Sequence, residues 1–313
     1  MAVPLATGVG LAQTTSTGPT FVTEWGSTGD EDGQFKNPLG VSSDASGNVY
    51  VADQNNERIQ KFDSSGNFIT KWGIFGKEDG NFLYPIEVAT DTSGNVYVID
   101  RKSPRVQKFD SDGNFVTKWG TQGNGDGQFY LDYRFDYGPA GIATDTSGNV
   151  YVVDQGNLRV QKFDSDGNFI TKWGTRGDGD GGFRKPRGIA TDASGDVYVA
   201  DPYTSRVQRF DSNGNFITQW GRYGSKDGQL YYPEGVATDA SGDVYVADTY
   251  NNRIQKFDSN GNFITKWGTR GSEDGQFSHP HSATVDTSGN VYVADTANNR
   301  IQKFSQTPTP HEE

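Results

Sequence analysis

The sequence predicts an all-β fold, a six-bladed β-propeller with four antiparallel strands in each blade. The first observation is a repeat, because six tryptophans, each followed by glycine, are spaced 47, 47, 54, 47 and 47 residues apart. They are Trp25, Trp72, Trp119, Trp173, Trp220 and Trp267. The second observation is that each repeat holds four short runs rich in Val, Ile, Tyr, Phe and Thr, separated by Gly, Asp, Asn and Ser. Short strands joined by turns, repeated about six times at a fixed period, are the parts of a propeller.

The strands of each repeat follow one another in a constant order. The first strand comes after a proline, and a turn such as Asp44-Ala-Ser-Gly-Asn48 leads to the second strand, Val-Tyr-Val-Ala-Asp or a close variant. A variable tetrapeptide leads to the third strand, and a turn such as Asp63-Ser-Ser-Gly-Asn67 leads to the outer strand that ends at Trp-Gly. Aspartate that bonds its own backbone, with glycine where positive φ is required, suits such hairpin turns. No stretch keeps a helical apolar period for ten residues, so almost no helix is expected.

The two ends of the chain predict how the ring closes. The last repeat stops at Phe304 after its third strand, and the missing outer strand stands at the other end as Phe21-Val-Thr-Glu-Trp-Gly26. Pairing this N-terminal strand (about 20–26) with the last blade covers two otherwise exposed strand edges. We therefore expect one closed propeller over residues 20–304.

Three segments carry a resemblance to a known family. They are Asp32-Gly-Gln-Phe35, Gly47-Asn-Val-Tyr-Val-Ala-Asp53 and Asn251-Asn-Arg-Ile-Gln-Lys-Phe257, and related segments recur in all six units. They closely resemble the NHL repeat, whereas the Asp that follows Trp in a WD repeat is absent. The resemblance implies a six-bladed propeller. It leaves the function open, since such domains serve as RNA- or protein-binding platforms, as extracellular sensors and occasionally as a metal-dependent amidating lyase.

Every unit also carries an aspartate and an arginine five residues apart, at the link between the second and third strands. We interpret these pairs as structural, binding the loop backbone or each other, and the alternative is a ring of charged ligand contacts. The pairs are Asp53/Arg58, Asp100/Arg105, Asp154/Arg159, Asp201/Arg206, Asp248/Arg253 and Asp295/Arg300. The tryptophans are likewise expected to pack the outer strands between blades.

Composition limits the range of partners. The formal net charge is −12, and nucleic-acid binding needs a clustered basic surface that neutralises phosphates. The acidic balance therefore argues against nucleic acid, although one inter-blade loop carries a local basic cluster of Arg176, Arg184, Lys185 and Arg187. The chain has no cysteine, so neither disulfides nor thiolate chemistry are expected. No run approaches the roughly 18 apolar residues of a membrane span.

The segments outside the repeats suggest a location. Residues 1–19 match no blade, and Val3 to Ala12 resembles the end of a secretory signal without its basic start. This segment is therefore either a signal-peptide remnant or a disordered tail. Residues 305–313 are expected to form a disordered Pro/Thr tail. These features favour an extracellular or cell-surface location, and a monomer.

Because successive strands alternate in direction, the connections separate onto two faces of the disc. The turns between first and second and between third and fourth strands are nearly constant, and their side is termed the turn face. The links between second and third strands and between blades form the loop face, which carries almost all the variation. Variable loops on a rigid scaffold are where binding normally resides. The variable tetrapeptides are 54–57, 101–104, 155–158, 202–205, 249–252 and 296–299.

One insertion stands out on the loop face. The spacing from Trp119 to Trp173 is longer than the others, and the excess lies between Phe129 and Pro139. Its chemistry-bearing residues are Tyr130, Tyr133, Arg134, Phe135 and Tyr137. Tyrosine and arginine are over-represented at binding hot spots, so we predict a recognition loop. The alternative is that the segment folds over the disc and plugs the central channel, and the two can coexist.

Further residues of the loop face complete the predicted site. Other aromatic residues in its loops are Tyr84, Tyr203, Tyr223, Tyr231, Tyr232 and Tyr250, a set that suits stacked sugar rings or an extended peptide. The residues that follow the inter-blade prolines should ring the channel mouth: Leu39, Ile86, Ala140, Arg187, Glu234 and His281. From these two sets we select Tyr231, Tyr232, Arg187, Glu234 and His281 as candidate ligand contacts.

Signals for an enzyme are weak. The lyase branch needs zinc held by several histidines, whereas this chain has His279 and His281 in one loop and His311 in the tail, short of three ligands and an open position. Neither a nucleophile elbow nor a phosphate-cradling loop is present. Asp110-Ser-Asp112-Gly-Asn114 resembles the front half of a calcium loop, but the later acidic ligands are missing, so a plain turn is favoured over a weak calcium alternative. We expect no metal or other cofactor.

These observations predict a non-enzymatic recognition scaffold that binds a protein, peptide or glycan on the loop face. Two alternatives stay open, a hydrolase or lyase acting at the channel mouth and a purely architectural spacer. The near identity of the repeats would also suit an engineered consensus propeller. The insertion, Leu230 in place of Phe and Gln219 in place of Lys favour a natural chain.

Overall fold

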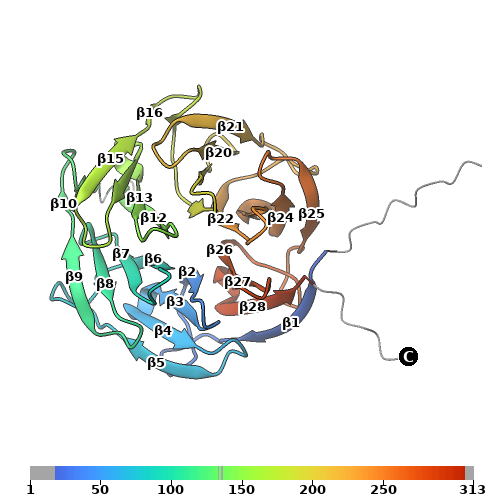
Figure 1. Ribbon diagram of the computed structural model, residues 1–313. Coiled ribbons are helices and arrows are strands. Elements are labelled where there is room, and N and C mark those ends of the chain that lie inside the picture. Colours follow the sequence, from blue (N-terminus) through green and yellow to red (C-terminus); the bar gives the residue numbers. More distant parts are fainter. Residues whose placement is uncertain (1–17, 133, 135–136, 307–313) are drawn as a thin grey trace, which may run out of the picture.

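The structure is a computed structural model, and it describes residues 18–132, 134 and 137–306. Its strands form a closed ring of six four-stranded sheets, the blades, around a central channel (Figure 1). Five blades run in sequence order from an inner strand to an outer strand, and neighbouring strands are antiparallel. The predicted all-β, six-bladed propeller is confirmed.

The blades have closely similar boundaries. The strands of the first three blades are β2 (Pro38–Ser43), β3 (Val49–Asp53), β4 (Arg58–Phe62), β5 (Phe68–Trp72); β6 (Pro85–Thr90), β7 (Val96–Asp100), β8 (Arg105–Phe109), β9 (Phe115–Trp119); and β12 (Pro139–Thr144), β13 (Val150–Asp154), β14 (Arg159–Phe163), β15 (Phe169–Trp173). Those of the last three are β18 (Ile189–Thr191), β19 (Val197–Asp201), β20 (Arg206–Phe210), β21 (Phe216–Trp220); β22 (Pro233–Thr238), β23 (Val244–Asp248), β24 (Arg253–Phe257), β25 (Phe263–Trp267); and β26 (Pro280–Val285), β27 (Val291–Asp295), β28 (Arg300–Ser305), β1 (Thr20–Trp25).

Two kinds of minor element lie in the connections. Short parallel ribbons pair β10 (Thr121–Gln122) with β11 (Gln128–Phe129) and β16 (Thr175–Arg176) with β17 (Gly182–Phe183). Single 3-10 turns between second and third strands are η1 (Gln54–Asn56), η2 (Gln155–Asn157), η3 (Thr249–Asn251) and η4 (Thr296–Asn298). The expectation of almost no helix is confirmed.

The ring closes through the N-terminal strand. The sixth blade has the order β1-β28-β27-β26, with Phe21 opposite Phe304 and Trp25 opposite Ile301. Figure 1 shows β1 on the outside of β28, so the two ends of the propeller lie side by side. The predicted closure is confirmed, and it covers the edge of β28 that would otherwise be exposed.

One aspartate organises each inner hairpin of the turn face. Asp44 Oδ1 accepts hydrogen bonds from the backbone N–H of Ser46 and of Asn48, both at 2.9 Å, and Oδ2 accepts from the Tyr50 hydroxyl at 3.0 Å. Gly47 has φ of 83°, which glycine adopts without a steric penalty. The same tyrosine–aspartate bond recurs in the other five blades, so each hairpin is held by its own side chains.

The tryptophans pack between neighbouring blades. The ring centroid of Trp72 lies 6.2 Å from that of Tyr50 in its own blade and 5.7 Å from that of Phe109 in the next. Its indole covers Gly113, where an added Cβ would lie 2.6 Å from the ring. The buried apolar clusters follow the same plan, and one of them joins Tyr50 and Ile59 of the first blade to Val96 and Phe109 of the second. Each blade therefore buries its apolar face against the next.

The Asp–Arg pairs hold the inter-blade loops onto the blades. Arg58 Nε donates to Asp53 Oδ2 at 2.7 Å, and its terminal nitrogens donate to three backbone carbonyls of the loop 30–34. Asp53 Oδ1 accepts from the backbone N–H of Lys36 at 2.8 Å. The third, fifth and sixth blades have the same Nε contact at 2.7 to 2.8 Å. A charged pair with this many hydrogen bonds tolerates burial.

The second and fourth blades depart from this arrangement. Arg105 reaches Asp100 through Nη2 at 3.4 Å. In the described part of the chain no ion pair joins Asp201 to Arg206, and Arg206 donates instead to Gln219 Oε1 at 2.6 Å. Both blades lack the asparagine that supports the aspartate elsewhere, as Asn56 does for Asp53 at 2.8 Å.

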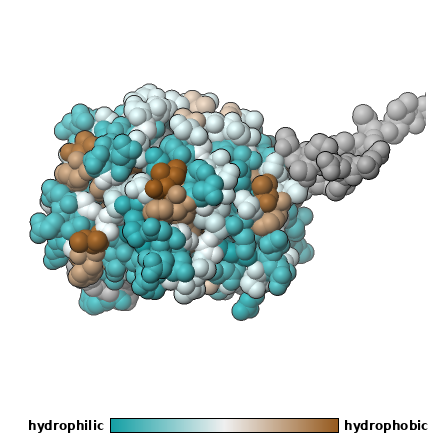
Figure 2. All heavy atoms as spheres, turned by 90° about the horizontal axis from the view of Figure 1, so that it is seen from below, coloured by the Kyte–Doolittle hydropathy of each residue, from teal (hydrophilic) through white to brown (hydrophobic). Residues whose placement is uncertain are grey.

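The outer wall of the ring carries scattered apolar groups. Each outer strand exposes one apolar β-branched residue: Val22, Ile69, Val116, Ile170, Ile217 and Ile264. Figure 2 shows apolar residues on this wall as separate brown patches among hydrophilic surface. Lysines of the outer strands pair with aspartates of the inter-blade loops, as Lys71 does with Asp32 at 2.6 Å. Charge of this kind protects exposed strand edges from pairing.

Candidate functional site at the loop face

The insertion between the second and third blades forms a narrow hairpin. Asp132 and Tyr137 exchange backbone hydrogen bonds of 2.8 and 3.2 Å, and Arg134 pairs with Asp132 at 2.8 Å. Tyr130 packs against Gly156, where an added Cβ would lie 2.3 Å from its ring. Tyr130 is therefore partly engaged by the scaffold, whereas the Arg134 side chain is largely exposed.

Two predicted contacts of the insertion, Tyr133 and Phe135, lie outside the described residues. The described residues of the hairpin do not line the central cavity. They lie on the loop face beside the fourth blade, because Tyr137 faces Lys185.

A cluster of aromatic side chains occupies the loop face of the last three blades. It is termed the aromatic ridge, and its members are Tyr203, Tyr223, Tyr231, Tyr232, Tyr250 and His279. Tyr250 lies at its centre, stacked on Tyr232 with ring centroids 4.6 Å apart and 13° between the planes. Its ring also makes edge contacts with Tyr231 at 5.1 Å and His279 at 5.7 Å. Such stacked and edge-to-face pairs are the favoured aromatic geometries.

The ridge is open to solvent. Tyr203 and Tyr223 extend it, 5.9 Å from Tyr232 and 5.1 Å from Tyr231 between centroids. The exposed fractions of Tyr203, Tyr223 and Tyr250 are 57%, 71% and 44%. Exposed aromatic side chains that cluster in this way make the ridge a candidate interaction site.

Two ridge residues adopt a strained backbone. Tyr232 has φ of 58° and His279 has φ of 53°, and each precedes a proline. The left-handed region is uncommon for residues other than glycine, asparagine and aspartate, and Asn37 occupies the equivalent position in the first blade with φ of 60°. Strained conformations of this kind cluster at functional sites. In this conformation the Tyr232 ring stacks on Tyr250.

Lys185 connects the insertion to the ridge. Its Nζ donates to the Tyr232 hydroxyl at 2.9 Å and lies 4.9 Å from the ring centroid of Tyr203 and 5.8 Å from that of Tyr137. A cation placed over aromatic faces is attracted by their negative electrostatic potential. The insertion and the ridge therefore form one continuous surface.

Three of the predicted residues meet at the channel mouth. Arg187 Nη1 donates to Glu234 Oε1, and His281 Nε2 lies 3.4 Å from Glu234 Oε2. Burial, together with the charges of Arg187 and Arg101, holds the pKa of His281 well below its usual value, so the imidazole is neutral at pH 7. The other residues predicted for this ring, Leu39, Ile86 and Ala140, are buried apolar side chains. Of the residues predicted for the mouth, the polar ones thus belong to the fourth, fifth and sixth blades.

The same region continues into the ridge. The pKa of Tyr232 is raised to about 12, first by burial and then by the neighbouring charge of Glu234. Tyr232 precedes Glu234 by two residues on the same inter-blade connection. The aromatic ridge and the charged mouth are therefore in electrostatic contact.

Arg101 is a mouth residue that sequence reasoning missed. It follows β7, is buried, and donates from Nε to the Pro139 carbonyl of the next blade at 3.2 Å. Smaller polar side chains make the same inter-blade link elsewhere: Gln155 to Pro186, Thr249 to Pro280 and Thr296 to Pro38. A cation at a position occupied by neutral residues in the other blades was the available signal.

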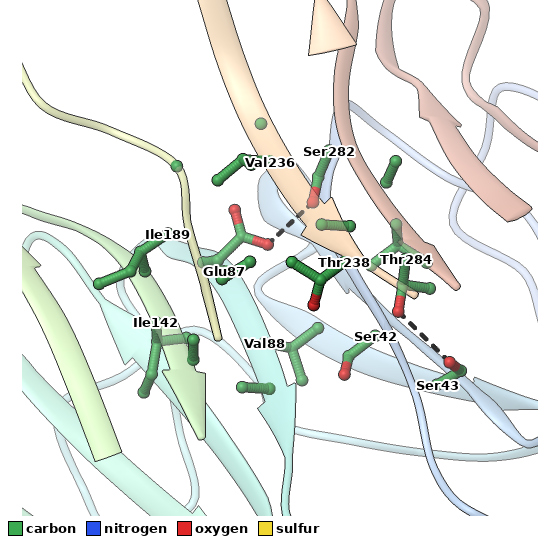
Figure 3. A pocket seen from close by; sticks show the side chains of 18 of the residues that line it. Ser42, Ser43, Glu87, Val88, Ile142, Ile189, Val236, Thr238, Ser282 and Thr284 are labelled. Atoms are coloured by element: carbon green, nitrogen blue, oxygen red, sulfur yellow. Dashed lines mark hydrogen bonds between the residues drawn. The ribbon is translucent and has the colours of Figure 1, made fainter. Parts of the chain in front are cut away.

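Glu87 of β6 is the second missed residue. It points across the channel, and its Oε1 accepts a hydrogen bond of 3.1 Å from the Ser282 hydroxyl (Figure 3). The carboxyl group passes over Gly40, where an added Cβ would lie 2.6 Å from Oε1. The equivalent position is glycine in four blades: Gly40, Gly141, Gly188 and Gly235. The two blades without this glycine have Glu87 and Ser282 instead, and these two residues are hydrogen-bonded to each other.

The protonation of Glu87 follows from its surroundings. Burial raises its pKa to about 8, against the opposing effects of the Ser282 hydrogen bond and of the charges of Arg187 and Arg101. At pH 7 the carboxyl group is therefore mostly protonated and neutral. This leaves the arginines of the mouth with less negative charge than the sequence alone indicates.

Deeper in the channel, hydroxyl groups link the inner strands. The Oγ1 atoms of Thr144, Thr191 and Thr238 each donate to the carbonyl of the corresponding threonine in the preceding blade at 2.7 Å. Ser43 and Thr284 join the first and last blades at 3.3 Å between hydroxyl oxygens (Figure 3). Because these hydroxyls bond to the neighbouring inner strands, their role in the channel below the mouth is chiefly structural.

The remaining acidic and histidine residues do not assemble a metal site within the described residues, where no group of three or more His, Cys, Asp or Glu is placed to hold an ion. Both oxygens of Asp110 accept hydrogen bonds from its own turn, at 2.8 to 2.9 Å. His279 belongs to the ridge, His281 to the mouth, and His311 lies outside the described residues. Over the same described ranges, no helix is long and apolar enough to cross a membrane.

Comparison with known proteins identifies the repeat. A family model described as the NHL repeat matches five segments: residues 35–62, 137–163, 183–210, 230–257 and 277–304. Each match ends with the third strand of a blade. No curated protein matches the chain.

Solved structures share the fold at low identity. A structural genomics protein of unknown function from Bacteroides thetaiotaomicron superposes with a TM-score of 0.70 and 16% identity, over 90% of this chain and 76% of that one. A virginiamycin B lyase from Staphylococcus aureus has a TM-score of 0.61 and 13% identity, over 90% and 98% of the two chains. A gluconolactonase from Xanthomonas campestris has a TM-score of 0.62 and 13% identity, over 91% and 96%. At these identities the similarity shows the fold alone.

Proposed function

The chain belongs to the NHL-repeat proteins, and on this premise we propose that it is a non-enzymatic recognition module whose ligand binds on the loop face. The aromatic ridge is its principal anchor, and the insertion contributes through Tyr137 and Lys185. The ligand is a glycan, a peptide or a protein segment. One observation carries the proposal: three ridge tyrosines in mutual contact with their neighbours keep 44% to 71% of their surface exposed.

The physical reasons favour binding over a purely structural role for these rings. Tyrosine offers a large apolar surface with a hydroxyl group and loses little conformational entropy when it is covered. The insertion, the aromatic ridge and the channel mouth also adjoin one another, and Lys185 links the insertion to the ridge.

The test is an array of glycans and peptides, followed by measurement of the dissociation constant for any binder. The ridge variant is Tyr231→Ala with Tyr250→Ala, and the insertion variant is Tyr130→Ala with Tyr137→Ala. Phe75→Ala is the matched control, because Phe75 is an exposed aromatic residue of another inter-blade loop. We expect the ridge variant to weaken binding by more than about tenfold, since an aromatic anchor contributes about 2 kcal/mol or more. Equal binding by all variants would contradict the proposal by placing the ligand elsewhere on the protein. No binding by the wild type would contradict it and favour the spacer.

A hydrolase or lyase acting at the channel mouth is the second candidate. It is favoured by Glu87, whose raised pKa of about 8 suits a general acid or base near neutral pH, and by the neutral imidazole of His281. Screening lactone and cyclic ester hydrolysis with the wild type and Glu87→Gln would decide between the candidates. Turnover that the substitution abolishes would establish the enzyme.

The location and assembly of the protein are also proposals. We infer an extracellular or cell-surface location and a monomer, supported by the composition of residues 1–19 and by charged residues that protect the outer strands from pairing. Fractionation of cells that express the full chain, with sedimentation analysis of the product, tests both. A cytoplasmic product or a stable dimer would overturn them.

A further inference from the structure

The mouth cluster, defined as Arg101, Arg187, Glu234 and His281, holds buried polar atoms that the protein does not satisfy. Among the residues that the structure describes, Arg187 Nε and both ring nitrogens of His281 are buried without a hydrogen-bond partner. The exposed fraction of His281 is 6%. Leaving such an atom unpaired costs about 1 to 3 kcal/mol, so it is normally matched by water or a ligand.

The charge of the surroundings selects the sign of that ligand. Two cations, Arg187 and Lys185, lie at or beside the mouth, and Glu234 is the anion that pairs with Arg187. Glu87, a second carboxyl group of this region among the described residues, is mostly neutral at pH 7. The net charge of the chain is −12, so its solubility does not depend on a locally positive recess. Such a recess is suited to an anionic group, which Arg binds through paired N–H donors.

The aromatic ridge indicates what the anionic group is attached to. Tyr232 contacts Tyr250 on one side and is close to Glu234 and Arg187 on the other, so a ligand that covers the ridge extends to the mouth. The C–H groups of a sugar ring carry partial positive charge and pack on the negative face of an aromatic ring. The phenolic hydroxyls at the rim of the ridge can bond to the sugar hydroxyls.

We propose that the mouth cluster binds the carboxylate of a uronic acid residue, while adjoining sugar residues of the same acidic oligosaccharide stack on the aromatic ridge. This assignment rests on the recognition function proposed above and names its ligand class. Arg187 is the main donor to the carboxylate, through Nε and the terminal nitrogens that Glu234 does not use. His281 donates one ring N–H, and Glu234 acts as an internal carboxylate that occupies Arg187 until the ligand displaces it.

The experiment compares acidic oligosaccharides with their neutral esters. The probes are trimers of galacturonate, glucuronate and mannuronate, each beside its methyl ester, titrated by calorimetry at pH 7 and about 0.15 M salt. We expect at least one acid to bind more than about tenfold more tightly than its ester, since a charge-assisted hydrogen bond contributes about 1.5 to 3 kcal/mol. Arg187→Gln should reduce this preference to about twofold or less, and Arg187→Lys should retain part of it. Arg176→Gln, which removes a charge from an exposed position, should leave the preference unchanged.

Glu234→Gln tests the proposal by an expected gain of affinity, which a failure of the variant to fold could not produce. Removing the internal carboxylate should strengthen binding of the acid several-fold and leave binding of the ester unchanged. Thermal unfolding of each variant confirms that it is folded. Weaker or unchanged binding of the acid by folded Glu234→Gln would overturn the proposed competition and with it the site.

The outcomes separate this proposal from the recognition function on which it rests. Equal binding of acids and esters, lost in the Tyr231→Ala, Tyr250→Ala variant, would leave the ridge as the binding site and remove the carboxylate assignment. Absence of binding to every trimer, with peptides bound at the ridge instead, would overturn the ligand class alone. Absence of any ligand for the loop face would overturn both.

Discussion

The turn face and the loop face are built by the same repeat, but they use their polar groups in opposite ways. On the turn face, the carboxylate of Asp145 accepts four hydrogen bonds of 2.7 to 3.0 Å from its own hairpin and from Tyr151. On the loop face, Arg187 and His281 keep buried atoms without partners, in the described part of the chain, and Tyr223 is largely exposed. The carboxylate that organises each inner hairpin of the turn face is satisfied within the protein, whereas these atoms of the loop face are not.

This difference shows which residues stabilise the fold and which are available for binding. A residue that recurs in every blade is engaged by a contact that also recurs, such as the tyrosine–aspartate bond. A residue that departs from the repeat does not make the recurring contact, so its side chain is available for another role. The second and fourth blades illustrate this, because the blades with the weakened Asp–Arg contact are those that supply Arg101 and Tyr203.

The largest expected effect comes from removing a turn-face carboxylate. Asp145→Ala deletes four hydrogen bonds and leaves the buried Tyr151 hydroxyl unpaired, so it should lower the free energy of unfolding by about 3 to 5 kcal/mol. Asp112→Ala changes an exposed aspartate of the same face and should stay within about 0.5 kcal/mol. Chemical denaturation measures both. Similar losses in the two variants would show that the buried hydrogen-bond set is not what stabilises this face.

A smaller effect is expected where glycine lies beneath tryptophan. Gly113→Ala combines φ of 88° with a Cβ placed 2.6 Å from the Trp72 ring, so we expect a loss of about 3 kcal/mol. Gly148→Ala has nearly the same φ, 82°, but nothing within 4 Å of the added atom, and should cost about 1 kcal/mol. Thermal and chemical unfolding of the pair isolate the packing of tryptophan between blades. Equal losses would assign the whole effect to backbone strain.

Much of the fold was predictable because every local pattern occurs six times. The N-terminal closing strand was found from the absence of Trp-Gly in the last repeat, and the position of Arg187, Glu234 and His281 followed from their place after a proline. The contacts that make a site of them were not predictable, since they join different blades. Glu87 and Ser282 are 195 positions apart, and only their departure from glycine marks them in the sequence.

The next effect concerns pH and the channel mouth. The folded pKa of Glu87, about 8, is raised above its ordinary value of 4.5. Between these values the folded protein retains a proton that the unfolded chain has released, so the stability due to this group falls as pH rises through the window. The free energy of unfolding of Glu87→Gln should match that of the wild type near pH 4.5. Above about pH 8 it should be about 2 kcal/mol larger, a value reduced to allow for solvent screening of the partly exposed side chain. Parallel unfolding curves over this pH range measure the difference, and a constant difference would contradict burial of the carboxyl group.

The smallest effect on stability is expected at the aromatic ridge, and it completes the comparison of the two faces. Tyr250→Ala removes a ring that is 44% exposed and packs on other rings of the ridge, so the free energy of unfolding should change by no more than about 1 kcal/mol. The same substitution should abolish most of the affinity for the loop-face ligand, because that ring contacts Tyr231, Tyr232 and His279 at the centre of the ridge. A turn-face substitution should do the reverse, lowering stability while leaving affinity unchanged in the folded fraction. If Tyr250→Ala instead destabilises the protein as strongly as Asp145→Ala, the ridge is part of the scaffold and the functional division between the faces fails.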